Sequence, residues 1–357
     1  MLKTPFYDPK KSYDENYEQG PFGDFTQVIF KSTDRAGEPK YSFLGQPVYL
    51  PFGIPAGPLL NSRFTSAAFK KGFDICVYKT VRAKSHPCHP WPNVLAAHFN
   101  GDLTLEEASK NIVADTDYTE PLSITNSFGV PSKPVEEWQD DIKQALSHVS
   151  KGQVLIASFQ GTSDGSGDFE KYVTDFVLAA KLVKEAGAKI LEANLSCPNE
   201  GKTDLLCFDI PRTKAIAERI KAEVGTTPLI LKIAYMDEKL LREFVQELGN
   251  VVQAFSAINT IAATIVDSEG KQALPGEGRA RSGVCGAGIK WAGMEMVSRL
   301  VALRKEFNMN YEIIGVGGVL NAEDYQAYRD SGADAVMSAT GAMWNPELAE
   351  EIYQQKT

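Results

Sequence analysis

The sequence predicts an α/β protein whose core is a (β/α)₈ barrel. Three observations predict it: eight short apolar segments recur along the chain, amphipathic helical segments separate them, and polar side chains gather where several apolar segments end. Strands that alternate with helices indicate a parallel sheet with right-handed crossovers, and eight such units close naturally into a barrel. An open, doubly wound sheet is the alternative that the same alternation permits.

The N-terminal part of the chain differs from the rest. Residues 1–45 are polar, aromatic and rich in turn residues, so we expect an extension packed on the barrel, with a hairpin around 26–30 and 41–44. Residues 46–357 are expected to form the barrel itself. Tyr7, Tyr13 and Tyr17 are interpreted as packing residues of the extension.

The first half of the barrel contains four predicted strands. Segment 51–58 is apolar and rich in Gly and Pro, 73–80 and 154–160 are apolar runs, and 189–196 begins with Ile190 and Leu191 and stops before Pro198, which has no N–H for a sheet. The helices predicted after the first three strands are 62–71, with Ser62 as its cap, 135–149 after a long irregular segment 81–134, and 169–186, which Gly187 ends.

The second half repeats the pattern. The remaining strands are predicted at 229–234, 254–261, 311–316 and 335–340, and the remaining helices at 210–224, 238–248, 291–307, 322–331 and 346–355. A glycine-rich loop, 267–288, separates the sixth strand from its helix. Because barrel chemistry sits at the carboxyl ends of the strands, that end is where we expect the site.

Composition limits the classes of function. The 357 residues carry a net charge of −9, which does not favour nucleic acid as a partner. No run of 18 apolar residues predicts a membrane span, and the N-terminus lacks the apolar core of a signal peptide. The five cysteines are scattered and odd in number, so we expect reduced thiols and a cytoplasmic protein.

Glycines after three predicted strands indicate a phosphate site. They lie in Ser282–Gly286, Gly315–Gly318 and Ala339–Gly341, and glycines let backbone N–H groups approach an anion closely. In barrels the loops after strands seven and eight are the usual phosphate cradle. Glycines that serve turns alone are the alternative.

Lysines and amides at the strand ends indicate a polar ligand. Lys232 stands inside an apolar strand and Lys79 ends another, and each is explained by an ion pair, by Schiff-base chemistry or by a cation beside an electron-rich cofactor ring. The amides Asn126, Asn194, Asn199 and Asn259 both donate and accept hydrogen bonds, which suits a flat ring such as a pyrimidine. His86, Cys88, His89 and His98 match no tight zinc spacing, so no metal is predicted.

A set of residues occurs along the chain in a characteristic order: Lys79, Asn126–Gly129, the run Asn194-Leu-Ser-Cys-Pro-Asn199, Lys232, Asn259-Thr260, Gly315–Gly318 and Thr340-Gly341. Over roughly residues 48–357, this set resembles the dihydroorotate dehydrogenase family. The resemblance implies a TIM barrel that holds FMN and oxidises dihydroorotate to orotate in pyrimidine biosynthesis. It also implies a homodimer. Cysteine at position 197 resembles the Cys-type, class 1-like members, whereas the quinone-linked type has serine there.

The resemblance also implies roles for individual residues. Cys197 is implied as the base that removes the C5 proton while hydride passes from C6 to the flavin, and Lys232 is implied to stabilise the reduced ring. The implied substrate contacts are Lys79, Asn126, Phe128, Gly129, Val130, Asn194, Asn199, Asn259 and Thr260. The implied cofactor contacts are Ala56, Gly57, Lys79, Thr80, Asn194, Lys232, Gly283, Gly286, Gly317, Gly318, Ala339 and Thr340.

Two other functions stay open at this point. Lys79-Thr80 also resembles the strand end of dihydropyrimidine dehydrogenase, so another FMN oxidoreductase on a pyrimidine such as dihydrouracil is one alternative. A non-redox barrel, either a Schiff-base lyase that uses Lys232 or a phosphate-ligand binding protein, is the other. The sequence leaves open the electron acceptor, which in Cys-type members is fumarate or, through a partner subunit, NAD. The segment 81–121 has no counterpart that we can match.

Overall fold

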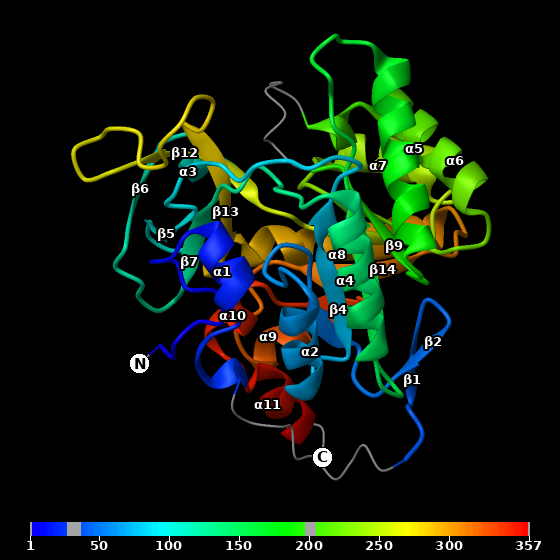
Figure 1. Cartoon of the computed structure of the whole chain (residues 1–357), viewed down its shortest axis with the longest axis horizontal. Coiled ribbons are helices and arrows are strands. Elements are labelled where there is room, and N and C mark those ends of the chain that lie inside the picture. The colour runs from blue at the N-terminus through cyan, green and yellow to red at the C-terminus, as the bar shows by residue number, and fades with distance from the viewer. Residues whose placement is uncertain (1, 27–36, 197–204, 356–357) are drawn as a thin grey trace.

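The core of the protein is a closed parallel barrel. The structure is a computed structural model that describes residues 2–26, 37–196 and 205–355. Within these residues, eight parallel strands pair around the barrel in chain order. They are β3 (Phe52–Ile54), β4 (Ile75–Val81), β8 (Val154–Phe159), β9 (Leu191–Asn194), β10 (Leu229–Ile233), β11 (Ala254–Ala257), β14 (Glu312–Val316) and β15 (Ala335–Met337). Figure 1 shows β4, β9 and β14 of this barrel among the helices. Each of the eight strands overlaps a predicted strand, so the (β/α)₈ prediction is confirmed and the open sheet is wrong.

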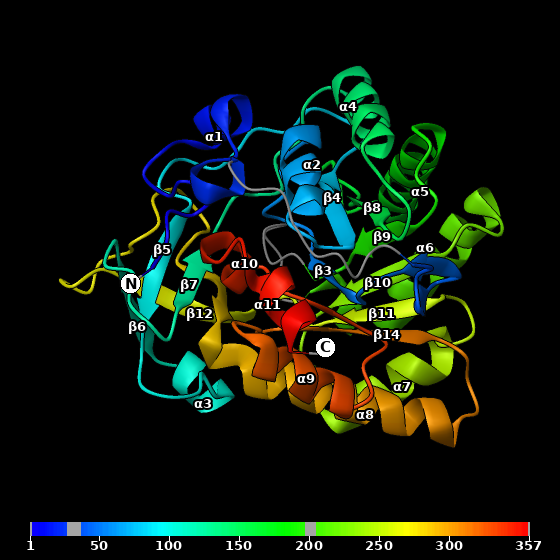
Figure 2. The ribbon, with the colours of Figure 1, turned by 90° about the horizontal axis from the view of Figure 1, so that it is seen from below.

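Helices cover the outside of the barrel (Figure 2). They are α2 (Ser62–Lys70), α4 (Val135–Ser147), α5 (Phe169–Glu185), α6 (Ile210–Val224), α7 (Glu238–Leu248), α8 (Lys290–Glu306), α9 (Ala322–Asp330) and α11 (Leu348–Gln354). Gly187 follows α5 with φ of +101°, the left-handed conformation that ends a helix and that glycine adopts freely. The predicted cap of α2 is wrong by one residue, because the side chain of Asn61 accepts from the N–H of Arg63 while Ser62 binds Asp141.

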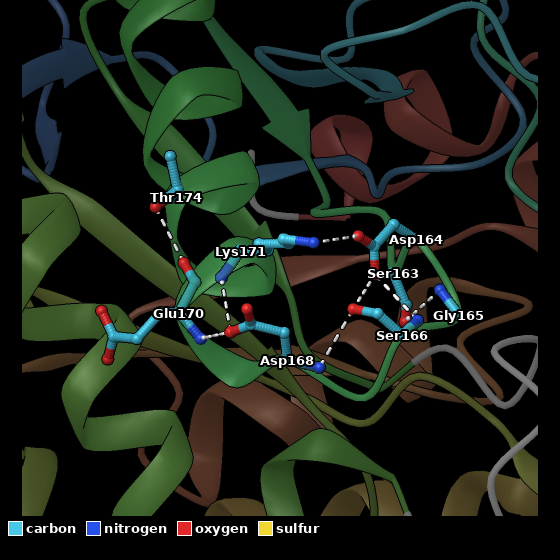
Figure 3. A network of polar contacts seen from close by, with 8 residues as sticks. All are labelled: Ser163, Asp164, Gly165, Ser166, Asp168, Glu170, Lys171 and Thr174. Atoms are coloured by element: carbon cyan, nitrogen blue, oxygen red, sulfur yellow. Dashed lines mark hydrogen bonds and ion pairs between the residues drawn. The ribbon is translucent and has the colours of Figure 1, made fainter.

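The loop before α5 shows how local polar groups start a helix (Figure 3). The Asp168 carboxylate accepts from the backbone N–H groups of Glu170 and Lys171 at 3.0 and 3.3 Å, which satisfies donors that the first turn leaves free. Asp164 accepts from Ser166 and lies 3.4 Å from the Lys171 ammonium. The side chains of this loop are therefore engaged in holding the loop and its helix.

A second sheet lies beside the barrel, and the sequence did not predict it. Within the described residues it contains β5 (Val94–His98), β6 (Asn111–Asp115), β7 (Ser123–Asn126), β12 (Ile261–Val266) and β13 (Arg281–Gly286) (Figures 1 and 2). Its strands come from two insertions, after β4 and after β11. The interpretation of 81–134 as irregular is thus wrong, and that of 267–288 as a loop is wrong for β13, because β13 pairs with β7 and with β12.

Both insertions begin at the carboxyl ends of barrel strands. Barrel sites form at that end, so the second sheet supplies one wall of the region in which a site is expected. Short helices complete the chain at α1 (Tyr13–Gln19), α3 (Leu105–Ala108) and α10 (Thr340–Trp344). In the described ranges, no helix combines the length and apolar character needed to cross a membrane.

The N-terminal segment is packed against the body of the protein. Phe6 donates its N–H to the carbonyl of Met343 at 3.0 Å, and the Trp91 indole donates to the carbonyl of Pro9 at 3.1 Å. Within the described residues, β1 (Tyr41–Phe43) pairs with β2 (Gln46–Val48) through the tight turn at Leu44-Gly45. Residues 27–30 of the predicted hairpin lie outside the described residues.

Candidate active site

Most of the predicted site residues line one pocket at the carboxyl end of the barrel. The volume of the pocket, including the part open to solvent, is about 770 Å³. Thirteen predicted residues line it: Ala56, Gly57, Lys79, Thr80, Asn126, Phe128, Gly129, Val130, Asn194, Lys232, Asn259, Thr260 and Gly283. They come from both the barrel and the second sheet. A concave site with a few convergent polar groups is the usual form of a small-molecule pocket.

Lys79 supplies a buried cation on one side of the pocket. Its ammonium donates to the carbonyl of Pro131 at 2.6 Å and lies 4.7 Å from the centre of the Tyr13 ring. Burial lowers the pKa of Lys79 to about 7, because the charged form loses its hydration. An anionic group of a ligand would restore that lost stabilisation.

Lys232 supplies a second cation on the pocket wall. It stands on β10 with only 4% of its surface exposed, and its ammonium lies 3.4 Å from the Ser256 hydroxyl on β11. Burial lowers the pKa of Lys232 to about 8, opposed by the nearby Glu192 carboxyl. The cation therefore faces the pocket from inside the barrel.

The loop that follows β7 has an unusual backbone. Gly129 and Val130 have φ values of +77° and +52°, a conformation that costs free energy for a branched residue such as valine. A Cβ atom on Gly129 would lie 2.4 Å from the His89 ring, so only glycine fits there. Such strain commonly persists where the surroundings hold a binding loop in place.

Two buried arginines hold this loop. Arg82 donates to the carbonyls of Val130 and Gly129 at 3.0 and 3.3 Å. Arg279 donates to the hydroxyl and the carbonyl of Ser127 at 3.1 and 2.9 Å. Because each guanidinium presents several donors in a fixed plane, the two side chains fix the loop that carries Phe128, Gly129 and Val130 into the pocket.

Three of the four predicted amides line the pocket. Asn194, at the end of β9, donates to Gln160 at 2.9 Å, and Asn259 donates to the Ser196 hydroxyl at 3.0 Å. Asn126, at the end of β7, lies 3.6 Å from the sulfur of Cys285. These amides bring hydrogen-bond donors and acceptors to one pocket, as their positions at the ends of the predicted strands led us to expect.

The predicted phosphate residues other than Gly283 do not line this pocket. Gly286 lies on β13 rather than in a loop, and its carbonyl is 3.0 Å from the place of a Cβ on Gly318. Gly317 and Gly318 have φ of +132° and +66°. Cys285 connects the two regions, since its sulfur accepts from both Asn126 and the Thr340 hydroxyl, the latter at 3.5 Å. Ala339 directly precedes α10.

Cys197 and Asn199 lie outside the described residues. The structure adds three pocket residues that the sequence did not predict, namely Tyr13, Leu60 and Pro131. Tyr13 was interpreted as packing, yet its ring forms a wall of the pocket against Lys79. Nothing in the local pattern of residues 1–45 distinguishes Tyr13 from Tyr7 or Tyr17.

The histidines of the segment after β4 contact neighbouring parts of the chain. His86 pairs through its backbone with Ser132, and His89 donates its N–H to the carbonyl of Phe128 at 3.0 Å. His98 lies 2.8 Å from Asp115 on the second sheet. The part of the chain that the structure describes contains no group of three or more His, Cys, Asp or Glu side chains suited to a metal.

Comparison with known proteins identifies the family. The family model for dihydroorotate dehydrogenase matches residues 116–356. A dihydroorotate dehydrogenase of Dictyostelium discoideum is 35% identical over 359 residues, which cover 98% of this chain and 96% of the relative. The catalytic subunits of dihydroorotate dehydrogenase B (NAD(+)) from Maridesulfovibrio salexigens and Thermodesulfovibrio yellowstonii are 28% and 26% identical over 66% of this chain, covering 72% and 73% of the relatives. The chain belongs to the dihydroorotate dehydrogenase family.

Proposed function

We propose that this protein oxidises dihydroorotate to orotate with FMN as its cofactor, and that Cys197 is the base. The observation that carries the proposal is the pocket in which Lys79, Lys232 and three of the four predicted amides converge, in a chain of this family. Asn199, the fourth amide, and Cys197 both belong to the segment that the structure does not describe. When bound, FMN supplies the acceptor for the hydride that leaves the substrate.

The pocket residues fit the flavin ring, and residues beyond the pocket fit its phosphate. The small residues Ala56 and Gly57 leave room for a flat ring, since a Cβ on Gly57 would meet no atom within 4 Å. Lys232 would place a cation beside the ring, and Thr80 and Asn194 would provide polar contacts. The phosphate would lie at Gly317, Gly318, Ala339 and Thr340, whose backbone N–H groups would contact it, with Gly283 and Gly286 nearby on β13.

Lys79 is the residue that favours dihydroorotate over an uncharged pyrimidine. Its buried ammonium has three donors, and among the described residues the structure gives it one hydrogen-bond acceptor, the carbonyl of Pro131. The carboxylate of dihydroorotate would satisfy the remaining donors, whereas dihydrouracil would leave them unpaired in a dry site. Asn126, Asn259 and Thr260 would hold the ring, and the backbone of Phe128–Val130 would close over it.

The role of Cys197 follows from thiol chemistry. A free thiol titrates near 8.5, so its thiolate can accept the C5 proton near neutral pH. Substitution Cys197→Ala should retain the yellow flavin and lose its reduction by dihydroorotate at neutral pH, while Cys197→Ser should keep activity mainly at high pH. Normal reduction in the alanine variant would refute the assignment.

The function is tested by following orotate formation with a panel of acceptors. Purified protein should release FMN on denaturation and form orotate from dihydroorotate when fumarate, NAD, a quinone or oxygen is present in turn. No flavin and no orotate with any acceptor would refute the proposal. Trapping of a carbonyl substrate by borohydride in flavin-free protein would instead support a lyase that uses Lys232.

A further inference from the structure

A carboxyl group lies inside the barrel beside Lys232, and the proposed reaction gives it no task. Glu192 stands on β9 between Ile190 and Asn194, directly across from Ser158 on β8 and from Ile230 on β10. Alternate residues of a strand share a face. Ile190 and Ile230 belong to the apolar cluster inside the barrel and Asn194 lines the pocket, so Glu192 also points inward.

Lys232 is the neighbour of Glu192 one step closer to the pocket. Lys232 pairs in register with Asn194 on β9 and with Ser256 on β11, two residues beyond the level of Glu192. Both side chains are on the inner face of adjacent strands. Lys232 therefore lines the pocket, and Glu192 lies behind it on the side of the barrel core.

The surroundings of Glu192 offer little else to stabilise a charge. The residue is fully buried, and within the described residues neither carboxyl oxygen makes a hydrogen bond of good geometry. Burial raises the pKa of Glu192, whereas the Lys232 cation and the Ser158 hydroxyl favour its charged form, and that hydroxyl is shared with Thr80 at 3.0 Å. A buried carboxylate without a partner is costly, so a nearby cation is needed.

The other titratable groups around Lys232 are not anions. Cys285 on β13 faces it, and burial raises the pKa of that thiol, so the thiol stays neutral. Across the pocket are Lys79 on β4 and Tyr13 on α1, whose phenol has a pKa raised well above its usual value. Among the described groups, Glu192 is the principal one that favours the protonated form of Lys232.

We propose that Glu192 is a positioning residue whose buried carboxylate keeps Lys232 protonated and thereby sets the positive charge that the pocket wall presents to an electron-rich ring. The inference rests on the proposed flavin function and extends it to a residue that does not touch the pocket. The carboxyl acts through Lys232 alone, so its effect disappears when that lysine is absent. The inference also predicts that the protonation of Lys232, and with it the charge of the pocket wall, depends on pH and that Glu192 controls this dependence.

The test is the reduction potential of the bound flavin as a function of pH in Glu192→Gln and wild-type holoprotein. Loss of the lysine proton should produce a break in this profile, and the break should move to lower pH in the variant by one unit for each tenfold weaker proton affinity. Between the break of the variant and that of wild type, where only the wild-type lysine keeps its proton, the variant flavin should be harder to reduce, by about 30 mV for each tenfold loss of preference for the reduced form.

The control is the same substitution in a Lys232→Met background, where Glu192→Gln should move no break. Superimposable profiles of wild type and Glu192→Gln would overturn the inference while leaving the proposed function intact. Wild-type protein that carries no flavin would instead refute the proposed function.

A second readout is independent of the flavin potential. Removal of one member of a buried pair leaves the other uncompensated, whereas removal of both is much less costly. Purified Glu192→Gln/Lys232→Met protein should therefore unfold at a higher temperature than Glu192→Gln. If the double variant unfolds at the same or a lower temperature, or if only the single variant folds, the two residues are not a pair.

Discussion

At the scale of single residues, Lys79 is the group that most directly connects burial with ligand choice. Its pKa of about 7 lies below the ordinary value of 10.5, so the protonated fraction in the free protein falls as pH rises through 7. A bound carboxylate favours the protonated form. Binding above pH 7 therefore requires uptake of a proton, and affinity for a carboxylate ligand is expected to fall by about tenfold per pH unit there.

The prediction is that orotate binds the oxidised holoprotein progressively more weakly above pH 7. Spectral titration of the flavin with orotate at several pH values measures this dependence. Lys79→Gln is the matched variant: its affinity should be lower at pH 6 and nearly independent of pH. An equal pH dependence in wild type and variant would show that another group controls binding.

Tyr13 is the second residue with a specific prediction. Its ring packs against Phe128 at 6.2 Å between centroids and contacts the Lys79 ammonium. Tyr13→Phe keeps both contacts and should change orotate affinity little. Tyr13→Ala removes the ring and should weaken binding about tenfold, since a desolvated cation–π contact is worth about 1–2 kcal/mol.

Calorimetric titration with orotate compares the two Tyr13 variants with wild type. An equal loss of orotate affinity in Tyr13→Phe and Tyr13→Ala would attribute the effect to the phenol hydroxyl instead of the ring. Unchanged orotate affinity in both variants would show that Tyr13 does not contribute to ligand binding.

At the scale of elements, the loop after β7 depends on the arginines that hold it. Arg82→Met removes donors to the carbonyls of Gly129 and Val130 and should release their strained backbone. We expect orotate affinity to fall at least about tenfold, because a buried hydrogen bond to a charged donor contributes about 1.5–3 kcal/mol. The barrel strands should still form, since the loop lies outside them.

Arg281→Met is the matched control for this loop. Arg281 is an exposed residue of β13 that donates to the carbonyl of Ala262, away from residues 127–131. Its substitution should leave orotate affinity close to that of wild type. A loss of affinity as large as that of Arg82→Met would attribute the effect to general loss of arginine.

The same scale explains what the sequence predicts well and what it does not. Barrel strands such as Val154–Phe159 are continuous apolar runs followed by amphipathic helices, which is a local signal. The second sheet has no such signal, because β7 pairs with β13 more than 150 residues away. Short antiparallel strands with distant partners are defined by tertiary pairing, which propensity does not reveal.

Among the site residues too, those with a local sequence signal were predictable and those defined by tertiary contacts were not. Lys79, Asn194 and Lys232 were predictable because each interrupts or ends an apolar strand, where a polar residue needs a reason. Tyr13 was not predictable as a pocket residue, because packing explains an aromatic residue in a polar segment as well as a binding role does. Arg82 and Arg279 were missed because their role is to hold a loop, and nothing in their sequence neighbourhood indicates that contact.

At the scale of the whole molecule, the barrel, its insertions and the N-terminal segment line one pocket. Barrel strands β4, β9 and β10 place Lys79, Asn194 and Lys232 at one end. The second sheet adds Asn126 and Gly283, and the N-terminal segment adds Tyr13. The proposed function requires that these parts together bind a flavin and a carboxylated pyrimidine, so the half-reaction between the two is its central claim.

The most direct test is anaerobic mixing of the purified holoprotein with dihydroorotate, followed by the visible absorbance of the flavin. We predict that dihydroorotate bleaches the flavin within one turnover, and that dihydrouracil at the same concentration reduces it far more slowly, since it lacks the carboxylate for Lys79. Bleaching by dihydrouracil as fast as by dihydroorotate, or no bleaching by either, would contradict the proposed function.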